Sequence, residues 1–476
     1  MISTRTRIMY GTGGAVYAAK EAAYTMFVLL FYTQVLGLSG TVTGLIIALS
    51  LVWDGISDPM VGSLSDRLRS RWGRRHPFMV FSIIPLGLGF IGLFGPPQVV
   101  VDSTGLLPAW LLFWSLWVRT FVTTFSIPHL ALSAEITSNY HHRSQILGAR
   151  MAFIFLFSVL LPAAALMFIF PTTDGIDGRF VSGNYPLYGA LSCAVVWLTA
   201  TITCTGTRQH IHSSRDASVS QGDTGSLKTL LRDLSRTLQN STFRLVLAYE
   251  FAAMASYGAV ASLNMLVWTY YWQFSAREIS LILSAPSLLA IILVLVTLKP
   301  LSRRFPKHRL MQFSLVGMIL DCLWLYPPQM AGLLPADNRP LMFALNFVFM
   351  MIFMYCFLLR GINTQSVVAD LTDEHELEHG LRQEAGFFSM INFVIKSATV
   401  VGPLYGGIAL DVIGLSADMR PGAVPDSTLS GLVFALGLGV IPPLLVALAL
   451  ACKISMSEEK VSAIQAAINQ RHLSQS

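Results

Sequence analysis

The sequence predicts an all-α integral membrane protein with twelve transmembrane helices. Of its 476 residues, 54% are hydrophobic and only 12% are charged, which lies outside the range of soluble globular proteins. Apolar segments of the roughly 20 residues needed to cross a bilayer occur twelve times. The basic residues that give the net charge of +6 are confined to particular loops. The composition therefore indicates a polytopic membrane protein and argues against a nucleic-acid partner.

The twelve apolar segments form two sets of six, separated by a polar stretch rich in Ser, Thr, Asp and Arg. This stretch reads as a linker between two pseudo-symmetric six-helix bundles. We expect an N-terminal bundle at 1–206, a cytoplasmic linker at 207–242, a C-terminal bundle at 243–453 and a cytoplasmic tail at 454–476. The predicted spans are 10–37, 41–65, 77–96, 107–134, 146–170 and 186–206, then 243–273, 278–299, 310–331, 340–369, 385–412 and 428–452.

The distribution of Lys and Arg predicts the orientation, because cytoplasmic loops carry the excess of these residues. With both termini in the cytoplasm, the basic run after the second span, the linker, the 303–309 loop and the tail share one side. The loops on the opposite side hold only Arg179, Arg277, Arg339 and Arg420. The first span follows Met1 to Arg7 directly, so we expect no cleavable signal peptide. The predicted location is the inner or plasma membrane.

The two halves also resemble each other. Ala134-Glu135-Ile136-Thr137 follows the fourth span, and Ala369-Asp370-Leu371-Thr372 follows the tenth span. An acid and a Thr at the same place in each half favour a duplicated six-helix unit. Duplicated halves that enclose a site at the membrane midplane are typical of major facilitator transporters.

Two carboxylates lie inside the second span. Asp54 and Asp58 are four residues apart, so on a helix they share one face about 6 Å apart, with Ser57 beside them. Two acids in a low-dielectric setting repel each other unless one is protonated or a cation lies between them. The pair therefore predicts a site for Na⁺ or H⁺, against the alternative of two acids facing water at a helix end.

The loop after the second span carries a second pattern. Gly62, Asp66 and Arg67, followed by basic residues, resemble the loop signature of the major facilitator superfamily. We expect Gly62 to permit close helix approach and Asp66 to form ion pairs at the inner face. A plain positive-inside anchor is the alternative reading. The gating candidates are Gly62, Asp66, Arg67, Arg71, Arg74 and Arg75.

Within that superfamily the chain resembles the glycoside-pentoside-hexuronide:cation symporters, the family of the melibiose permease. The residues that carry the resemblance are Tyr10-Gly11-Thr12-Gly13, Tyr32-Thr33, Gly37-Leu38-Ser39, Trp53-Asp54, Asp58-Pro59, Ser70-Arg71-Trp72-Gly73-Arg74 and Lys396. The resemblance implies a cation held by Asp54, Asp58, Ser57 and Thr123.

The solute-binding residues of that family are mostly replaced. The first-span acid falls on Ala18, the fourth-span acid on Ser126 and the stacking Trp on Leu130, whereas the fifth-span Arg corresponds to Arg150. The remaining solute-binding candidates are Lys20 and Glu21, which could instead form an internal ion pair, and Trp53, which could stack on a sugar ring.

Lys396 lies inside the eleventh span, where an ionisable side chain is costly. An ammonium near Asp54 and Asp58 would compete with the bound cation, and the family resemblance supports this coupling role. We therefore expect Lys396 and the two acids to be electrostatically coupled.

These observations predict a cation-coupled secondary transporter of a glycoside or a similar hydroxylated solute, working by alternating access as a monomer. A lysophospholipid symporter is the alternative, since the replaced solute residues would suit a more apolar cargo. A transport-inactive sensor or scaffold would be expected to lack the intramembrane acids. No catalytic residues, cofactor or metal site beyond the transported monovalent cation are predicted, and the loops hold no nucleotide-binding motif.

Overall fold

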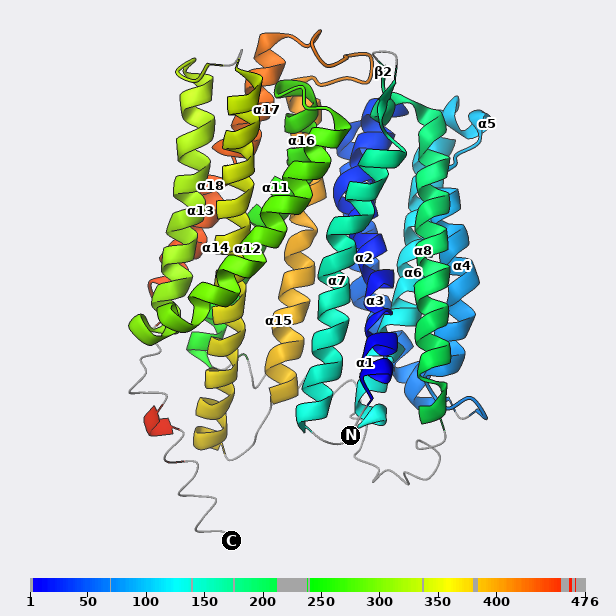
Figure 1. Cartoon of the computed structure of the whole chain (residues 1–476), viewed down its shortest axis with the longest axis vertical. Coiled ribbons are helices and arrows are strands. Elements are labelled where there is room, and N and C mark those ends of the chain that lie inside the picture. The colour runs from blue at the N-terminus through cyan, green and yellow to red at the C-terminus, as the bar shows by residue number, and fades with distance from the viewer. Residues whose placement is uncertain are drawn as a thin grey trace. The chain divides into compact units, whose positions relative to one another are not determined.

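The computed structural model describes residues 3–68, 70–137, 140–173, 176–211, 238, 240–335, 338–379, 384–454, 462–464 and 467. The predicted linker at 207–242 and the predicted tail at 454–476 therefore lie mostly outside the described residues, as does Arg69. Helices make up almost all of the described chain (Figure 1). A short antiparallel pair of strands, β1 (Thr172–Thr173) and β2 (Ile176–Asp177), interrupts them.

The chain forms two compact units. The first comprises Met1–Ser220, Asn264–Leu281 and Pro403–Thr428, and the second comprises Gln221–Leu263, Ile282–Gly402 and Leu429–Ser476. The first unit thus includes two segments from the second half of the sequence. The predicted division at the linker remains a proposal.

The helices of the N-terminal half are α1 (Thr4–Gly11), α2 (Gly14–Ala22), α3 (Gly40–Arg67), α4 (His76–Phe94), α5 (Gln98–Val101), α6 (Leu106–Ile136), α7 (Tyr140–Phe168) and α8 (Tyr185–Gly206). In Figure 1, α2 runs beside α7, and the two pack together. α4 packs against both α6 and α8, and α3 packs against α6. α2 also packs against α6, and the site described below involves α2, α3 and α6.

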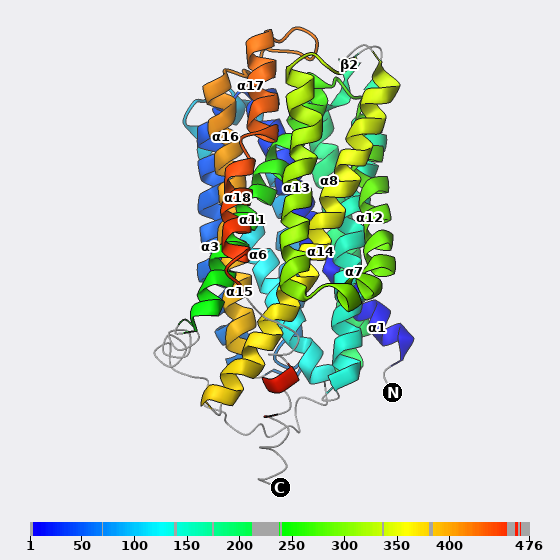
Figure 2. The same cartoon turned by 90° about the vertical axis from the view of Figure 1, so that its left-hand side faces the viewer.

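The helices of the C-terminal half are α11 (Ser241–Leu266), α12 (Ala276–Arg304), α13 (Lys307–Met330), α14 (Arg339–His379), α15 (Glu384–Thr399), α16 (Val401–Ile413), α17 (Asp426–Gly437) and α18 (Ile441–Ala451). α13 packs against α14, and the two run side by side in Figure 2. Single turns of 3₁₀ helix occur at Gly178–Phe180, Ser182–Asn184 and Arg208–His210, and a π-helical turn at Val267–Tyr271.

Eleven helices among the described residues are long and apolar enough to cross a membrane, and they coincide with eleven of the twelve predicted spans. The remaining predicted span, 10–37, is helical but not one regular α-helix. Gly11, Gly13 and Gly14 separate α1 from α2, and π-helical turns follow at Ala23–Val28 and Phe31–Val35. The break and the wider turns explain why this span is not a single long helix.

Helix α3 is anchored at its N-terminus by a carboxylate. Asp411 accepts hydrogen bonds from the backbone amides of Gly40 and Thr41, each at 2.8 Å, and from the hydroxyl of Ser39 at 2.7 Å. A carboxylate is favoured here because the first amides of a helix lack partners and carry the positive end of its dipole. A Cβ on Gly40 would lie 2.5 Å from the carbonyl oxygen of Gly407, so glycine permits this close approach.

Candidate functional site

The candidate cation site lies between α3 and α6. Asp54 and Asp58 are one turn apart on α3, and Arg119 and Thr123 are one turn apart on α6. Asp54 contacts Arg119 and Asp58 contacts Thr123, so both contacts join residues separated by the same 65 positions. A constant offset over one turn requires the two helices to run in the same direction. This agrees with their predicted places as the second and fourth spans.

Arg119 occupies one side of the acid pair. Its Nη1 donates to Asp54 Oδ2 at 2.6 Å, its Nε donates to Ser50 Oγ at 2.7 Å, and its guanidinium lies 4.6 Å from the ring centroid of Tyr24. The side chain of Arg119 is only 2% exposed and that of Asp54 is 8% exposed. An ion pair so well shielded from water interacts strongly, and removing either partner would leave the other charge buried and unpaired.

The first predicted span contributes a second cation. Lys20 Nζ lies 2.9 Å from Glu21 Oε1, 3.8 Å from Asp54 Oδ2 and 4.4 Å from the ring centroid of Tyr17. The internal Lys20–Glu21 ion pair considered from the sequence is therefore present. These residues directly precede the π-helical turn Ala23–Val28, which carries Tyr24. π-Helical turns occur frequently at functional sites because they re-aim side chains.

The contacts join acidic and basic side chains from α2, α3 and α6. Asp54 Oδ2 lies 2.6 Å from Arg119 Nη1 and 3.8 Å from Lys20 Nζ, and Lys20 also pairs with Glu21. One turn further along α3, Asp58 accepts from the Thr123 hydroxyl. Two carboxylates one turn apart inside a membrane span repel each other unless a proton, a cation or a basic side chain balances them.

Three other predicted site residues have defined surroundings. Ser57 Oγ donates to the Asp54 carbonyl at 3.5 Å, and Trp53 Nε1 donates to Thr120 Oγ1 at 2.8 Å, so both are engaged locally. Arg150 lies on α7, and its Nε is buried without a hydrogen-bond partner among the described residues. Arg150 is thus the residue of the three that has hydrogen-bonding capacity left for a solute.

Lys396 lies near the end of α15 and is half-buried. It belongs to the second unit, whereas Asp54 and Asp58 belong to the first. Its coupling to the acids therefore stays a prediction.

The predicted gating residues include a network at the end of α3. Arg75 forms ion pairs with Asp66 and with Glu135, the latter at 3.0 Å, and its Nη1 donates to Ser65 Oγ at 2.7 Å. Arg74 also contacts Glu135, at 2.9 Å. These contacts join α3, α6 and the turn before α4. Arg75 is therefore held by two acids, and its gating role stays a prediction.

The expectation for Gly62 is wrong in this structure. A Cβ on Gly62 would meet only Ile127 Cγ2, at 3.7 Å, which is an ordinary van der Waals contact. The close approaches of α3 occur instead at Gly40 and Gly44, where a Cβ would lie 2.5 Å and 2.4 Å from backbone oxygens. The loop signature therefore does not mark the tight contact of this helix.

The contacts distinguish two arginines that the sequence left equivalent. We predict that Arg75→Gln slows transport several-fold without inverting the protein, because it breaks the pairs with Asp66 and Glu135 while the other basic loops keep the topology. Arg71→Gln is the matched control, since Arg71 has no side-chain partner among the described residues. Uptake rates and the accessibility of terminal tags would be measured. Equal uptake by the two variants would contradict a gating role for Arg75.

The second unit contains an ion pair that corresponds to the one formed by Glu135. Asp370, the counterpart of Glu135 in the duplicated pattern, accepts two hydrogen bonds from Lys307 Nζ at 2.8 and 2.6 Å. In each unit, an acid near the end of one helix thus pairs with a basic residue at the start of another. This parallel supports duplication of the six-helix unit. A separate buried ion pair in the second unit joins Arg360 and Glu250 at 2.5 Å.

Bundled membrane helices in two units, with a buried charged cluster in the first, define a polytopic membrane protein of the major facilitator fold. The chain belongs to the family described as MFS/sugar transport protein, which it matches over residues 9–457. The predicted resemblance to the major facilitator superfamily is therefore confirmed. The family consists of membrane transporters, which agrees with the expectation that the chain is not an enzyme.

Several curated relatives are named as transporters. The isoprimeverose transporter of Lactiplantibacillus pentosus is 22% identical, over 88% of this chain and 82% of that protein. The sodium-dependent lysophosphatidylcholine symporter 1 of Gallus gallus is 29% identical, over 33% of this chain and 30% of that protein. The uncharacterized symporter sll1374 of Synechocystis is 33% identical, over 31% of this chain and 28% of that protein. For several of these relatives, the match thus spans less than a third of their length.

Solved structures confirm the fold. A bacterial homologue of the human lysosomal transporter Spinster covers 95% of this chain and 98% of its own, with a TM-score of 0.63 and 14% identity. The xylose transporter XylE from E. coli covers 97% of each chain, with a TM-score of 0.57 and 13% identity. At these identities the similarity establishes the architecture alone.

The sequence reasoning missed the role of Arg119. Arg119 lies inside the fourth predicted span, but the sequence analysis did not place it at the acid pair. The signal was present, because Arg119 is one turn before Thr123, as Asp54 is one turn before Asp58. Placing Thr123 beside Asp58 puts Arg119 beside Asp54.

Proposed function

We propose that the chain is a cation-coupled symporter whose coupling site is formed by Asp54, Asp58 and Thr123. The observation that carries the proposal is the pair of carboxylates one turn apart on a membrane-spanning helix, with Asp54 bound by Arg119 and Asp58 accepting from Thr123 Oγ1. A Na⁺ or a H⁺ at this pair would reduce the repulsion between the two carboxylates. The relatives named as symporters, one of them sodium-dependent, support coupling to a cation.

Arg119 gives the site two states. When no external cation is bound, the Arg119 guanidinium neutralises Asp54. When a cation binds at Asp54 and Asp58, the repulsion between like charges displaces the guanidinium, which keeps its contacts with Ser50 and the Tyr24 ring. The cation and Arg119 thus compete for one carboxylate. Competition of this kind links ion occupancy to the position of α6 against α3.

We propose a glycoside or a similar hydroxylated molecule as the solute, with Arg150 as one contact. The free hydrogen-bonding capacity of Arg150 Nε suits a hydroxyl or an anionic oxygen. The isoprimeverose transporter, which aligns over most of both chains, favours this class. The lysophosphatidylcholine symporter keeps a lipid solute as the second candidate. We place the protein in the inner or plasma membrane, as a monomer with both termini in the cytoplasm.

Uptake into proteoliposomes tests this function. A panel of labelled glycosides and lysophosphatidylcholine would be offered with a Na⁺ gradient, with a H⁺ gradient, and with neither. We expect a glycoside to accumulate above its external concentration only with one of the gradients. Arg150→Gln should raise the half-saturating solute concentration by about tenfold, because one charged hydrogen bond to the solute is lost. The cation affinity should not change. Uptake that does not depend on a gradient would contradict symport. If lysophosphatidylcholine alone were taken up, the solute would be the lipid rather than a glycoside.

A further inference from the structure

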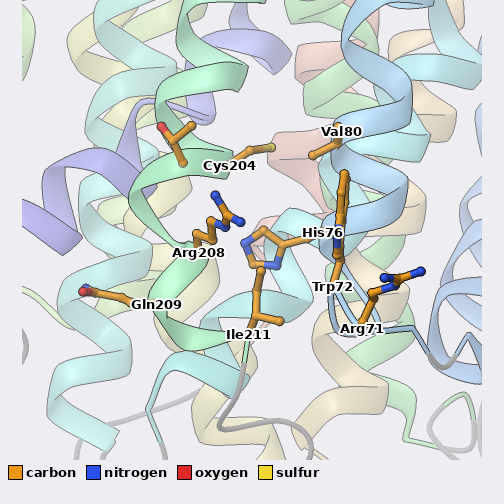
Figure 3. Close-up of a pocket in the computed structure, with 9 residues that line it drawn as sticks. Arg71, Trp72, His76, Val80, Cys204, Arg208, Gln209 and Ile211 are labelled. Carbon is orange, nitrogen blue, oxygen red and sulfur yellow. The ribbon is translucent and has the colours of Figure 1, made fainter.

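A cavity of about 700 Å³ lies in the first unit, away from the charged cluster, where α4 begins and α8 ends. Figure 3 shows Trp72, His76 and Val80 on one side of it and Cys204 and Arg208 on the other. Because α4 and α8 are both membrane-spanning helices, their shared end places the cavity at the level of the lipid headgroups. The transport proposal does not involve these side chains.

The charge of the cavity is positive and unbalanced. Arg208 and Arg71 both line it and are both exposed, and none of the described residues that line it is Asp or Glu. Within the part of the chain that the structure describes, neither guanidinium has a side-chain hydrogen bond or ion pair. In Figure 3 the Arg208 guanidinium lies beside the His76 ring and faces Val80, whereas the Arg71 guanidinium lies beyond Trp72 and points away from Arg208. The ligand that fits this charge is an anion.

The walls of the cavity are largely apolar. Val80, Cys204 and Ile211 contribute aliphatic or thiol surface, and the indole of Trp72 is 53% exposed. Trp is enriched where membrane helices meet the headgroup region. A small hydrated anion such as free phosphate gains nothing from these walls. An anion joined to a glycerol backbone and acyl chains would contact both the basic and the apolar parts.

We propose that this cavity binds an anionic phospholipid of the adjacent leaflet. Arg208 contacts the headgroup phosphate, Arg71 adds positive charge at the rim, and Trp72 and Val80 contact the glycerol region. Basic pockets between membrane helices on the cytoplasmic side recognise anionic headgroups in this way. With the proposed orientation, the leaflet is the cytoplasmic one, where anionic lipids attract basic residues.

The test measures the thermal unfolding midpoint of the purified full chain in detergent. Phosphatidylglycerol, phosphatidylcholine or inorganic phosphate would be titrated into the wild type and into Arg208→Gln. We expect phosphatidylglycerol alone to raise the midpoint of the wild type, and Arg208→Gln to need at least about tenfold more of it for the same rise. Arg71→Gln, at the rim, should need a smaller excess.

The matched control is Arg303→Gln, which removes an exposed arginine at the end of α12 in the second unit and should respond as the wild type does. An equal response of Arg208→Gln and the wild type would overturn the proposal, because the lipid would then bind elsewhere. An equal effect of inorganic phosphate would overturn it in favour of a soluble anion. The readout does not involve transport, so failure of the symport proposal would leave this result standing.

Discussion

Replacing Asp54 with Asn is expected to abolish gradient-driven accumulation and to destabilise the folded protein. The substitution removes the charge that holds either Arg119 or the transported cation, so solute would reach only its equilibrium distribution. It also leaves the Arg119 guanidinium buried with no carboxylate at 2.6 Å. Removing one partner of a buried ion pair costs about 3–5 kcal/mol. Uptake into proteoliposomes and the unfolding midpoint would both be measured.

Two further variants distinguish the loss of the coupling site from the loss of folding stability. Asp54→Asn combined with Arg119→Gln removes both charges, so we expect it to recover most of the stability while accumulation stays absent. Asp102→Asn is the control for the substitution itself, because this carboxylate is exposed and, among the described residues, accepts a side-chain hydrogen bond from Gln98 alone. Accumulation at the wild-type level in Asp54→Asn would exclude this carboxylate from the coupling site.

Arg119→Gln is expected to tighten cation binding and to uncouple it from solute movement. Without the guanidinium, Lys20, 3.8 Å away, is the competing positive charge that Asp54 keeps among the described residues. Unit charges about 4 Å apart interact by roughly 4 kcal/mol at an effective dielectric near 20. If part of this repulsion is removed, the cation affinity rises by about tenfold to hundredfold. Cation titration of the purified variant, together with exchange and accumulation assays, measures both effects. Exchange should persist better than accumulation.

Lys396→Gln provides the comparison for Arg119→Gln. The sequence alone assigns the competing charge to Lys396, whereas the contacts in the first unit assign it to Arg119. If cation affinity rises more in Arg119→Gln than in Lys396→Gln, the charge that competes with the cation for Asp54 is Arg119 on α6. An unchanged affinity in Arg119→Gln, with accumulation intact, would reduce Arg119 to a structural charge.

The helical architecture could be predicted because each span satisfies its own backbone hydrogen bonds and must be apolar over the width of the bilayer. Composition therefore located eleven spans, although α14 continues well beyond the predicted end at 369. The first span departed from this rule, since π-helical turns such as Ala23–Val28 depend on what the side chains of Tyr24 and its neighbours contact. Tyr24 contacts Arg119 of α6 and Phe27 contacts Tyr188 of α8, and the local sequence does not reveal either partner.

The site could be predicted only where its geometry lies within one helix. The spacing of Asp54 and Asp58 fixes a shared face, so the acid pair was evident. The partner of Asp54 depends on how α6 is shifted along α3, and periodicity does not determine that shift. The same limit applies to Gly62, where a sequence signature suggested a close contact that tertiary packing places at Gly40 and Gly44.

The hydrogen bonds from Gly40 and Thr41 to Asp411 make these two amides natural reporters of the motion of α3. They lie about 21 Å from Asp54 along the same helix, at 1.5 Å per residue. A rigid helix that tilts in response to an ion at Asp54 must also shift at its N-terminus, and any shift there separates the amides from the carboxylate. Their exchange with deuterated water would then follow the occupancy of a site three to four turns away.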